Sequence, residues 1–316
     1  MKKQMISVVI PCYNSVGMID IVLDGILKTI VTRNDEFDYE IILINDGSKD
    51  NTWEVISNFA RTNKHIKALN FSKNYGQHSA LMAGYRNVKG DIILGLDDDG
   101  EHNPEEMFKL IDKLLEGYDY VCANYETNKS KFRSLGTKLN NAMATMMIDK
   151  PREIDFTSYY VMRRFVIDEI IRYQQPYPYV GGLLLRATRN IATVPLVRQK
   201  RIAGQSAYNL KKMFSLWFNG FTAFSVKPLR VATALGFISA ICGFILILIL
   251  ITEKLIGKDI ALGYTSTMAC IVFFSGMIMI LLGIIGEYIG RIYISINNAP
   301  QYVIKDIVEY EKKENE

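Results

Sequence analysis

Several features that often identify a protein's class are missing from this sequence. The four cysteines lie far apart in the 316 residues, and no spacing between them fits a metal-binding motif. We therefore expect reduced thiols with structural roles. The net charge of +4 is small and no basic stripe with interleaved aromatic residues occurs, which argues against a nucleic-acid partner. The first residues lack the apolar core of a signal peptide, so the N-terminal part is expected in the cytoplasm.

Hydrophobic residues are unevenly distributed along the chain. Residues 1–205 have the mixed composition of one domain, whereas residues 229–292 contain two apolar spans at about 229–252 and 265–290. Each span exceeds the roughly 20 residues that cross about 30 Å of hydrocarbon. Lysines and arginines flank the pair, and the charges between the spans cancel, which predicts a multi-pass hairpin with both termini in the cytoplasm. Buried core helices are the alternative.

Two further segments flank the spans. Residues 206–228 mix Lys211 and Lys212 with several aromatic side chains, as is typical of an amphipathic helix in the membrane interface. A buried amphipathic helix is the alternative for this segment. Residues 293–316 are predicted to form a charged cytoplasmic tail that is frayed from residue 306 onward.

Short apolar runs alternate with helical patterns in the first domain. Strands are predicted at 6–11, 39–44, 66–71, 91–96 and 118–123, and helices at 15–30, with Ser15 as N-cap, at 50–62, at 77–88 and from 104 onward. Strands separated by helices of this length imply right-handed crossovers. The sequence therefore predicts an α/β fold with a Rossmann-like, mostly parallel sheet.

An acidic triplet directly follows the apolar run at 91–96. In an extended segment, Asp97 and Asp99 point to one side and Asp98 to the other. Carboxylates in this arrangement can hold a hard divalent cation that shares its oxygen ligands with a phosphate. A solvated acidic turn is the alternative. Asn14, Asp46 and the triplet all follow predicted strands, and the carboxyl ends of parallel strands meet at one edge, so we expect one active site there.

Six short segments, taken together and in the order in which they follow along the chain, resemble the family 2 glycosyltransferases of the GT-A fold. Within that family the chain is similar to the polyisoprenyl-phosphate glycosyltransferases, a group that includes undecaprenyl-phosphate glucosyltransferases, aminoarabinose transferases and dolichol-phosphate mannose synthases. The likeness covers nearly the whole chain, whereas the Gln-x-x-Arg-Trp pattern of processive polysaccharide synthases is absent. The segments are 8–14, 44–50, 74–80, 97–104, 155–158 and 204–208.

The resemblance implies a nucleotide-sugar donor, most simply a UDP-sugar, and a bound Mg²⁺ or Mn²⁺. Asp46 would contact the donor base, and the alternative is that this residue serves only as an N-cap or turn former. The other implied donor and metal residues are Pro11 and Asn14 for the base pocket, Asp97, Asp99 and Glu101 for the metal and diphosphate, and Arg201 and Ser206 for the loop over the diphosphate. A membrane-facing cation is the alternative for Arg201.

The resemblance also implies an acceptor site. Asp155 matches the acidic residue proposed as catalytic base, although it can instead orient the acceptor or shape the site, and a loop-capping Asp is the alternative. Asp99 is the second implied catalytic carboxylate. Arg133 and Thr137, with Lys129 nearby, match the residues that bind lipid phosphate. The chain departs from the family pattern at Glu101, Glu126 and Ala207, and His78 is interpreted as structural.

Together these features predict an inverting transfer of a sugar to undecaprenyl phosphate at the cytoplasmic face of a bacterial inner membrane. Transfer to another membrane lipid is one alternative, and a catalytically inactive scaffold of a glycan assembly complex is another. Small residues in the second span permit close packing with membrane partners, and the resemblance makes a homotetramer plausible. The sequence does not identify the sugar.

Overall fold

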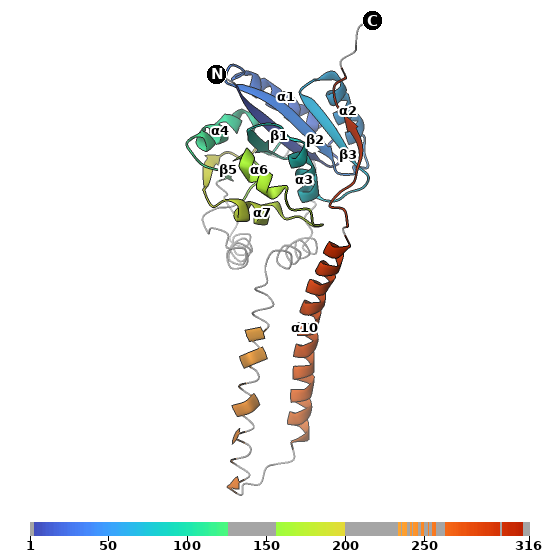
Figure 1. Ribbon diagram of the computed structural model, residues 1–316, viewed down its shortest axis with the longest axis vertical. Helices are drawn as coiled ribbons and strands as arrows, with labels where there is room; N and C mark the ends of the chain where they lie inside the picture. Colours follow the sequence, from blue (N-terminus) through green and yellow to red (C-terminus); the bar gives the residue numbers. More distant parts are fainter. Residues whose placement is uncertain are drawn as a thin grey trace. The chain divides into compact units, whose positions relative to one another are not determined.

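A computed structural model describes residues 3–125, 156–199, 263–297 and 299–311, with scattered helical residues between 233 and 256. The chain divides into two compact units. Unit 1 contains Met1–Tyr208 together with Asn298–Glu316, and unit 2 contains Asn209–Asn297. Unit 1 is therefore built from two parts of the chain that unit 2 separates in sequence (Figure 1).

Unit 1 is organised around an eight-stranded sheet with the order β7-β5-β6-β4-β1-β2-β3-β8. Strands β4, β1, β2 and β3 are parallel, which confirms the predicted α/β architecture. β6 runs antiparallel between β4 and β5, β7 is parallel to β5, and β8 is antiparallel to β3. The strands are β1 (Gln4–Cys12), β2 (Phe37–Asn45), β3 (Ile66–Phe71), β4 (Ile92–Gly95), β5 (Tyr120–Tyr125), β6 (Tyr160–Arg163), β7 (Ile191–Leu196) and β8 (Ile304–Val308).

Helices cover both faces of this sheet (Figure 1). The face that contains Val8 and Ile10 packs against α1, α2 and α4 in one apolar core. The opposite face, with Val9 and Ile44, packs against α3, and α7 contacts both α3 and α6. The helices are α1 (Ile19–Val31), α2 (Thr52–Thr62), α3 (Gln77–Asn87), the 3₁₀ turn η1 (Pro104–Glu106), α4 (Met107–Leu115), α6 (Arg164–Ile170) and α7 (Val180–Ala187).

The five predicted strands correspond to β1–β5, with ends that differ by at most two residues. The predicted start of the first helix was wrong, because α1 begins at Ile19 rather than after Ser15. The Ser15 carbonyl accepts hydrogen bonds from the Met18 and Ile19 N–H groups, so the chain makes a turn there first. The Ser15 hydroxyl bonds the Asp98 carboxylate instead of capping the helix.

The expected fraying from residue 306 was also wrong for the first residues of that segment. Residues 304–308 form β8, which pairs with β3 at the edge of the sheet. The Asp306 carboxylate accepts a hydrogen bond from Asn70 at 2.8 Å, and Glu309 forms an ion pair with Lys67 at 2.6 Å. Two of the charges that suggested a solvated tail therefore have partners on the neighbouring strand β3.

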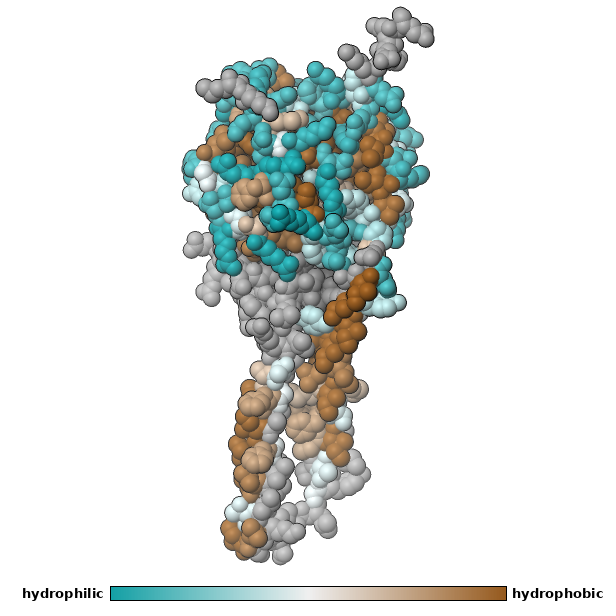
Figure 2. Space-filling model, viewed as in Figure 1, coloured by the Kyte–Doolittle hydropathy of each residue, from teal (hydrophilic) through white to brown (hydrophobic). Residues whose placement is uncertain are grey.

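Unit 2 contains one long helix among its described residues, α10 (Tyr264–Ile296). Its stretch Phe273–Ile294 has a mean hydropathy of 1.8 and no buried residues, so its length and composition would allow it to cross a membrane. Figure 2 shows the apolar side chains gathered along this helix. For the predicted first span, the described residues give a shorter apolar helix, Gly236–Ile245, so a second membrane-crossing helix is not confirmed.

Candidate active site

The loops after β1 and β2 are joined by direct hydrogen bonds at the carboxyl edge of the sheet. The Asp46 N–H donates to the Cys12 carbonyl at 2.9 Å. Asn14, which has a positive φ of 54°, donates its N–H to the Ser48 hydroxyl and accepts the Lys49 N–H with its side-chain oxygen. The predicted base-pocket residue Asn14 thus shapes the loop that follows Asp46.

The acidic triplet after β4 is fastened to the same edge through Asp98. The Asp98 carboxylate accepts the Tyr13 N–H at 3.1 Å and the Ser15 hydroxyl. Burial raises the pKa of Asp98 to about 6, although both hydrogen bonds act in the opposite direction. The middle carboxylate therefore has a positioning role, because it connects the triplet to the loop after β1.

Asp46 is buried, with 4% of its surface exposed. Its two carboxylate oxygens accept the N–H groups of Tyr75 and Gly76 at 2.7 and 2.9 Å. Burial raises the pKa of Asp46 to about 6, and the two hydrogen bonds limit that rise. Asp46 therefore holds the loop between β3 and α3 in place, a contact that the sequence did not indicate.

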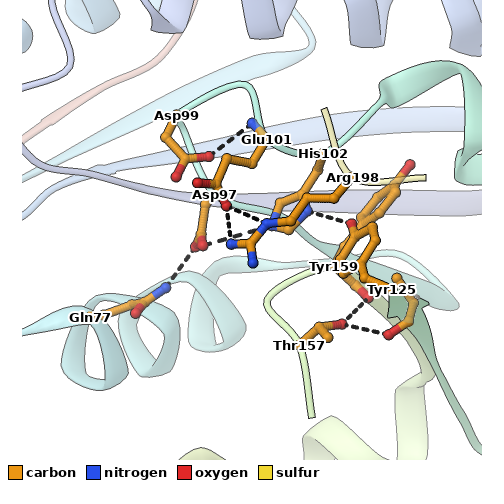
Figure 3. A network of polar contacts seen from close by, with 10 residues as sticks. Gln77, Asp97, Asp99, Glu101, His102, Tyr125, Thr157, Tyr159 and Arg198 are labelled. Atoms are coloured by element: carbon orange, nitrogen blue, oxygen red, sulfur yellow. Dashed lines mark hydrogen bonds and ion pairs between the residues drawn. The ribbon is translucent and has the colours of Figure 1, made fainter. Parts of the chain in front are cut away.

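Asp97 lies between α3 and a buried histidine (Figure 3). The Gln77 side chain donates to Asp97 Oδ1 at 2.6 Å, and His102 Nε2 lies 3.7 Å from Asp97 Oδ2. The His102 ring lies nearly parallel to the rings of Tyr125 and Tyr159 and bonds the Tyr125 hydroxyl through Nδ1 at 2.6 Å. These contacts set the direction of the Asp97 carboxylate.

Glu101 pairs with Arg198, two residues beyond the end of β7 (Figure 3). Arg198 Nε donates to Glu101 Oε2 at 2.7 Å, and Arg198 Nη2 contacts the same oxygen. The guanidinium carbon also lies 5.8 Å from the centre of the Tyr125 ring. The predicted metal ligand Glu101 thus has a cation as its partner.

The described residues fit a divalent cation only in part. No three His, Cys, Asp or Glu side chains come together as a metal-binding group within the described part of the chain. Asp97 and Asp99 nevertheless supply the hard oxygen donors that Mg²⁺ and Mn²⁺ prefer, and Asp99 accepts the Glu101 N–H at 3.0 Å within the turn. The pair can hold a cation whose other ligands come from a diphosphate and water.

The predicted site residues divide into two sets. Those at the carboxyl edge of the sheet are described, and they are Pro11, Asn14, Asp46, Asp97, Asp99 and Glu101. The others lie outside the described residues, and they are Lys129, Arg133, Thr137, Asp155, Arg201 and Ser206. Thr157, close to Asp155 in sequence, bonds the Ala123 carbonyl near the end of β5.

Sequence reasoning missed Gln77, His102 and Arg198. The available signals were that His102 directly follows the acidic run and that Arg198 lies two residues after the short strand β7. His78 remains structural in this arrangement: its ring packs edge-on against Tyr179, and burial lowers its pKa to about 4.

Known proteins resemble this chain over most of its length. Residues 7–171 match the model described as glycosyl transferase family 2, and residues 227–292 match the GtrB C-terminal hairpin. A Bacillus subtilis protein named uncharacterized glycosyltransferase YkcC is 33% identical over 97% of this chain and 95% of its own. An undecaprenyl-phosphate 4-deoxy-4-formamido-L-arabinose transferase of Proteus mirabilis is 32% identical over 97% of this chain and 95% of its own.

Solved structures share the fold at lower identity. Glucosyl-3-phosphoglycerate synthase from Mycobacterium tuberculosis, crystallised with Mn²⁺, UDP-glucose and phosphoglyceric acid, has a TM-score of 0.50 at 20% identity, covering 68% of this chain and 76% of its own. Mannosyl-3-phosphoglycerate synthase from Rubrobacter xylanophilus has a TM-score of 0.51 at 18% identity, covering 72% and 74%. The sheet and its helices are therefore of the GT-A type.

Proposed function

The chain belongs to glycosyl transferase family 2, and from this premise we propose that it transfers one sugar from a nucleotide sugar to undecaprenyl phosphate. The observation that carries the proposal is the joining of the Asp46 and Asp97–Asp99 loops at one edge of a GT-A sheet. The relative from Proteus mirabilis, which aligns over 97% of the chain, is named for transfer to undecaprenyl phosphate.

The donor is proposed to be a UDP-sugar held with Mg²⁺ or Mn²⁺. Support comes from the acidic turn and from the solved GT-A neighbour that was crystallised with Mn²⁺ and UDP-glucose. Asp97 and Asp99 would hold the cation, which when bound neutralises charge on the departing diphosphate. Pro11, Asn14 and Asp46 would form the base pocket, and Arg201 and Ser206 would contact the diphosphate.

The acceptor phosphate is proposed to lie beside Lys129, Arg133 and Thr137, and Asp155 would orient it. A phosphate monoester is largely ionised at neutral pH, so little proton abstraction is required of Asp155. Attack by the acceptor oxygen on the anomeric carbon, opposite the leaving diphosphate, would invert that centre. The bond formed is carbon–oxygen, and the bond broken is that between the sugar and the diphosphate.

The membrane arrangement is part of the proposal. The match of residues 227–292 to a C-terminal hairpin model and the exposed apolar surface of α10 support two membrane-crossing helices. The excess of positive charge on both sides of this pair supports a bacterial inner-membrane location with unit 1 at the cytoplasmic face. An acceptor with a lipid tail is consistent with an enzyme held at a membrane.

The test is a transfer assay with a panel of radiolabelled UDP- and GDP-sugars, undecaprenyl phosphate, and Mg²⁺, Mn²⁺ or EDTA. We expect a lipid-linked product from one donor, lost in EDTA and lost in the Asp99→Ala variant by at least about a hundredfold. The variant should still insert into membranes, because Asp99 lies outside unit 2.

Two results would contradict the proposal in different ways. If the sugar is transferred to diacylglycerol or another lipid and not to undecaprenyl phosphate, the proposed acceptor is wrong. UDP binding without transfer to any lipid would favour the scaffold interpretation.

A further inference from the structure

The pair formed by Glu101 and Arg198 joins two segments that are far apart in sequence. β7 and β5 run parallel and end together, with Leu196 beside Tyr125, so Arg198 emerges at the same edge of the sheet as the acidic turn. The Gln199 N–H also donates to the Glu101 carbonyl at 3.0 Å. The segment after β7 is therefore attached to Glu101 by both side-chain and backbone bonds.

The two partners differ in exposure. The Glu101 side chain is 14% exposed and that of Arg198 is 52% exposed, so the carboxylate lies beneath and the guanidinium faces outward. An ion pair with one partner this exposed contributes little to folding stability, typically about 0–1 kcal/mol. Stability alone is thus a weak reason for holding an arginine at this place.

The geometry leaves Arg198 able to bind a second anion. Both of its bonds to Glu101 end on one oxygen, Oε2, and come from Nε and Nη2. A guanidinium carries five N–H donors in a rigid fork, and phosphate matches that fork. The guanidinium carbon also lies 5.8 Å from the centre of the Tyr125 ring, within the range of a cation–π contact.

The charge of the turn gives a reason for such a cation. Asp97, Asp98, Asp99 and Glu101 place four acidic side chains within five positions, and a phosphate group approaching them would be repelled. A fixed arginine beside the turn offsets that repulsion. A metal ion bound to Glu101 Oε2 would be repelled by the positive guanidinium group of Arg198. This oxygen is therefore better suited to bind Arg198 than to bind a metal ion.

We propose that Arg198 is a phosphate-binding residue of the active site and that Glu101 is its positioning residue rather than a metal ligand. The inference rests on the proposed function, because that function supplies the phosphate groups. They come either from the donor diphosphate or from the acceptor phosphate, which share the same chemistry at the guanidinium.

The experiment uses the full chain in detergent or nanodiscs and compares Arg198→Gln, Arg198→Lys, Glu101→Gln and the double variant. UDP binding with Mg²⁺ is measured by calorimetry, and KM and kcat are measured separately for donor and acceptor. The matched control is Arg172→Gln. Arg172 lies in the turn after α6, and the change removes its exposed ion pair with Glu169 on α6. Thermal unfolding of every variant identifies any loss of fold.

Arg198→Gln is expected to weaken UDP binding or to raise one substrate's KM roughly tenfold to a hundredfold, with unchanged unfolding temperature. A change in UDP binding assigns the donor diphosphate, and a change in the acceptor KM alone assigns the lipid phosphate. Arg198→Lys should recover part of the loss. Glu101→Gln should have a smaller effect, and the double variant should match Arg198→Gln, because Glu101 acts through Arg198.

Wild-type affinity and KM values in Arg198→Gln would overturn the proposal. So would a Glu101→Gln variant whose half-saturating Mg²⁺ concentration rises more than about tenfold while that of Arg198→Gln does not, since Glu101 would then be a metal ligand. Failure of the wild-type chain to bind UDP or transfer sugar would instead count against the proposed function. The two failures are therefore distinguishable.

Discussion

At the scale of single residues, the buried carboxylate Asp46 connects the loop after β2 to the loop between β3 and α3. It accepts two backbone N–H groups from the loop between β3 and α3, and Asn74 donates its side-chain amide to the Asp46 carbonyl at 3.0 Å. Gly47 follows with a φ of 63°, and a Cβ there would collide with the backbone of Lys73 and Asn74. The base pocket proposed at Asp46 thus depends on a tight approach of two loops.

The raised pKa of Asp46 predicts a pH-dependent stability. The folded-state pKa of about 6 lies above the ordinary value of 3.8, so the folded protein binds this proton more tightly than the unfolded chain. The protonated carboxyl group therefore contributes to the free energy of unfolding at low pH. This contribution is fully present below about pH 4, is lost between pH 4 and 6, and is gone above pH 6, where the loss amounts to about 3 kcal/mol.

Asp46→Asn removes this titration, because an amide does not ionise. The unfolding temperature of wild type, measured relative to that of the variant, should therefore be highest at pH 4 and should fall toward pH 7. Asp38→Asn, at an exposed position of β2, is the control. A gap that stays constant across this pH range would show that Asp46 does not titrate there.

Some residues at this edge of the sheet could be predicted from the sequence, and others could not. The position of Asp97, Asp99 and Asp46 at one edge of the sheet was predictable, because each follows a strand whose pattern is clear. Arg198 was not, since its partner Glu101 lies 97 residues earlier and the pairing exists only once β7 has joined β5. For Asp98, the sequence predicted that the side chain points away from those of Asp97 and Asp99. It did not predict that Ser15 is the partner.

At the scale of elements, α3 connects the site to the sheet. Its first residue, Gln77, bonds Asp97, and Gly84 near its other end packs directly on β1 and β2. A methyl group at Gly84 would overlap the Val9 side chain and lie 3.1 Å from Ile44 Cδ1. The absence of a side chain at this position lets the helix approach the sheet closely.

Gly84→Ala is expected to lower the free energy of unfolding by about 1–3 kcal/mol, because the added methyl group overpacks a close contact. Gly25→Ala on α1 is the matched control, since its methyl group would lie 3.0 Å from Pro104 Cγ, whereas the methyl group at Gly84 would lie 2.4 Å from Val9 Cγ1. Both changes gain helix propensity, so their difference reports packing. Chemical denaturation of both variants provides the measurement, and equal stability would contradict the packing argument.

Local patterns explain why some elements were predicted and others were not. β1–β4 form a parallel centre whose apolar runs are buried on both faces, and such runs are readable in sequence. β8 is a five-residue edge strand with alternating exposure, and its pairing with β3 spans more than two hundred positions. Its charged side chains, read alone, resemble a solvated tail.

At the scale of the whole molecule, the chain leaves unit 1 before residue 209 and returns at residue 298. The returning segment, residues 299–308, is bound to unit 1 by more than β8. Its Val303 carbonyl accepts the Ser72 N–H at 3.0 Å, and its Tyr302 ring stacks on Phe71 with centroids 5.2 Å apart. Phe71 and Ser72 lead directly into the loop that Asp46 holds.

Arg86 on α3 is the main polar anchor of the returning segment. Its guanidinium donates to the side chains of Gln301 and Tyr302 at 2.9 and 3.0 Å, and to the Tyr173 carbonyl at 2.9 Å. Gln301 is 7% exposed and donates to the Gln175 carbonyl. Removing the arginine would leave the buried Gln301 side chain and two half-buried oxygens, the Tyr302 hydroxyl and the Tyr173 carbonyl, without their charged donor.

Arg86→Ala is therefore expected to destabilise unit 1 by about 2–4 kcal/mol, against less than about 0.5 kcal/mol for Arg61→Ala at an exposed position of α2. Deletion of residues 299–316 from the full chain should be more damaging still, because it exposes the edge of β3. Limited proteolysis and thermal unfolding of the purified variants provide the measurement. If the deletion leaves the melting temperature of unit 1 unchanged, the returning segment is an appendage, and the glycosyltransferase fold is complete before the chain enters unit 2.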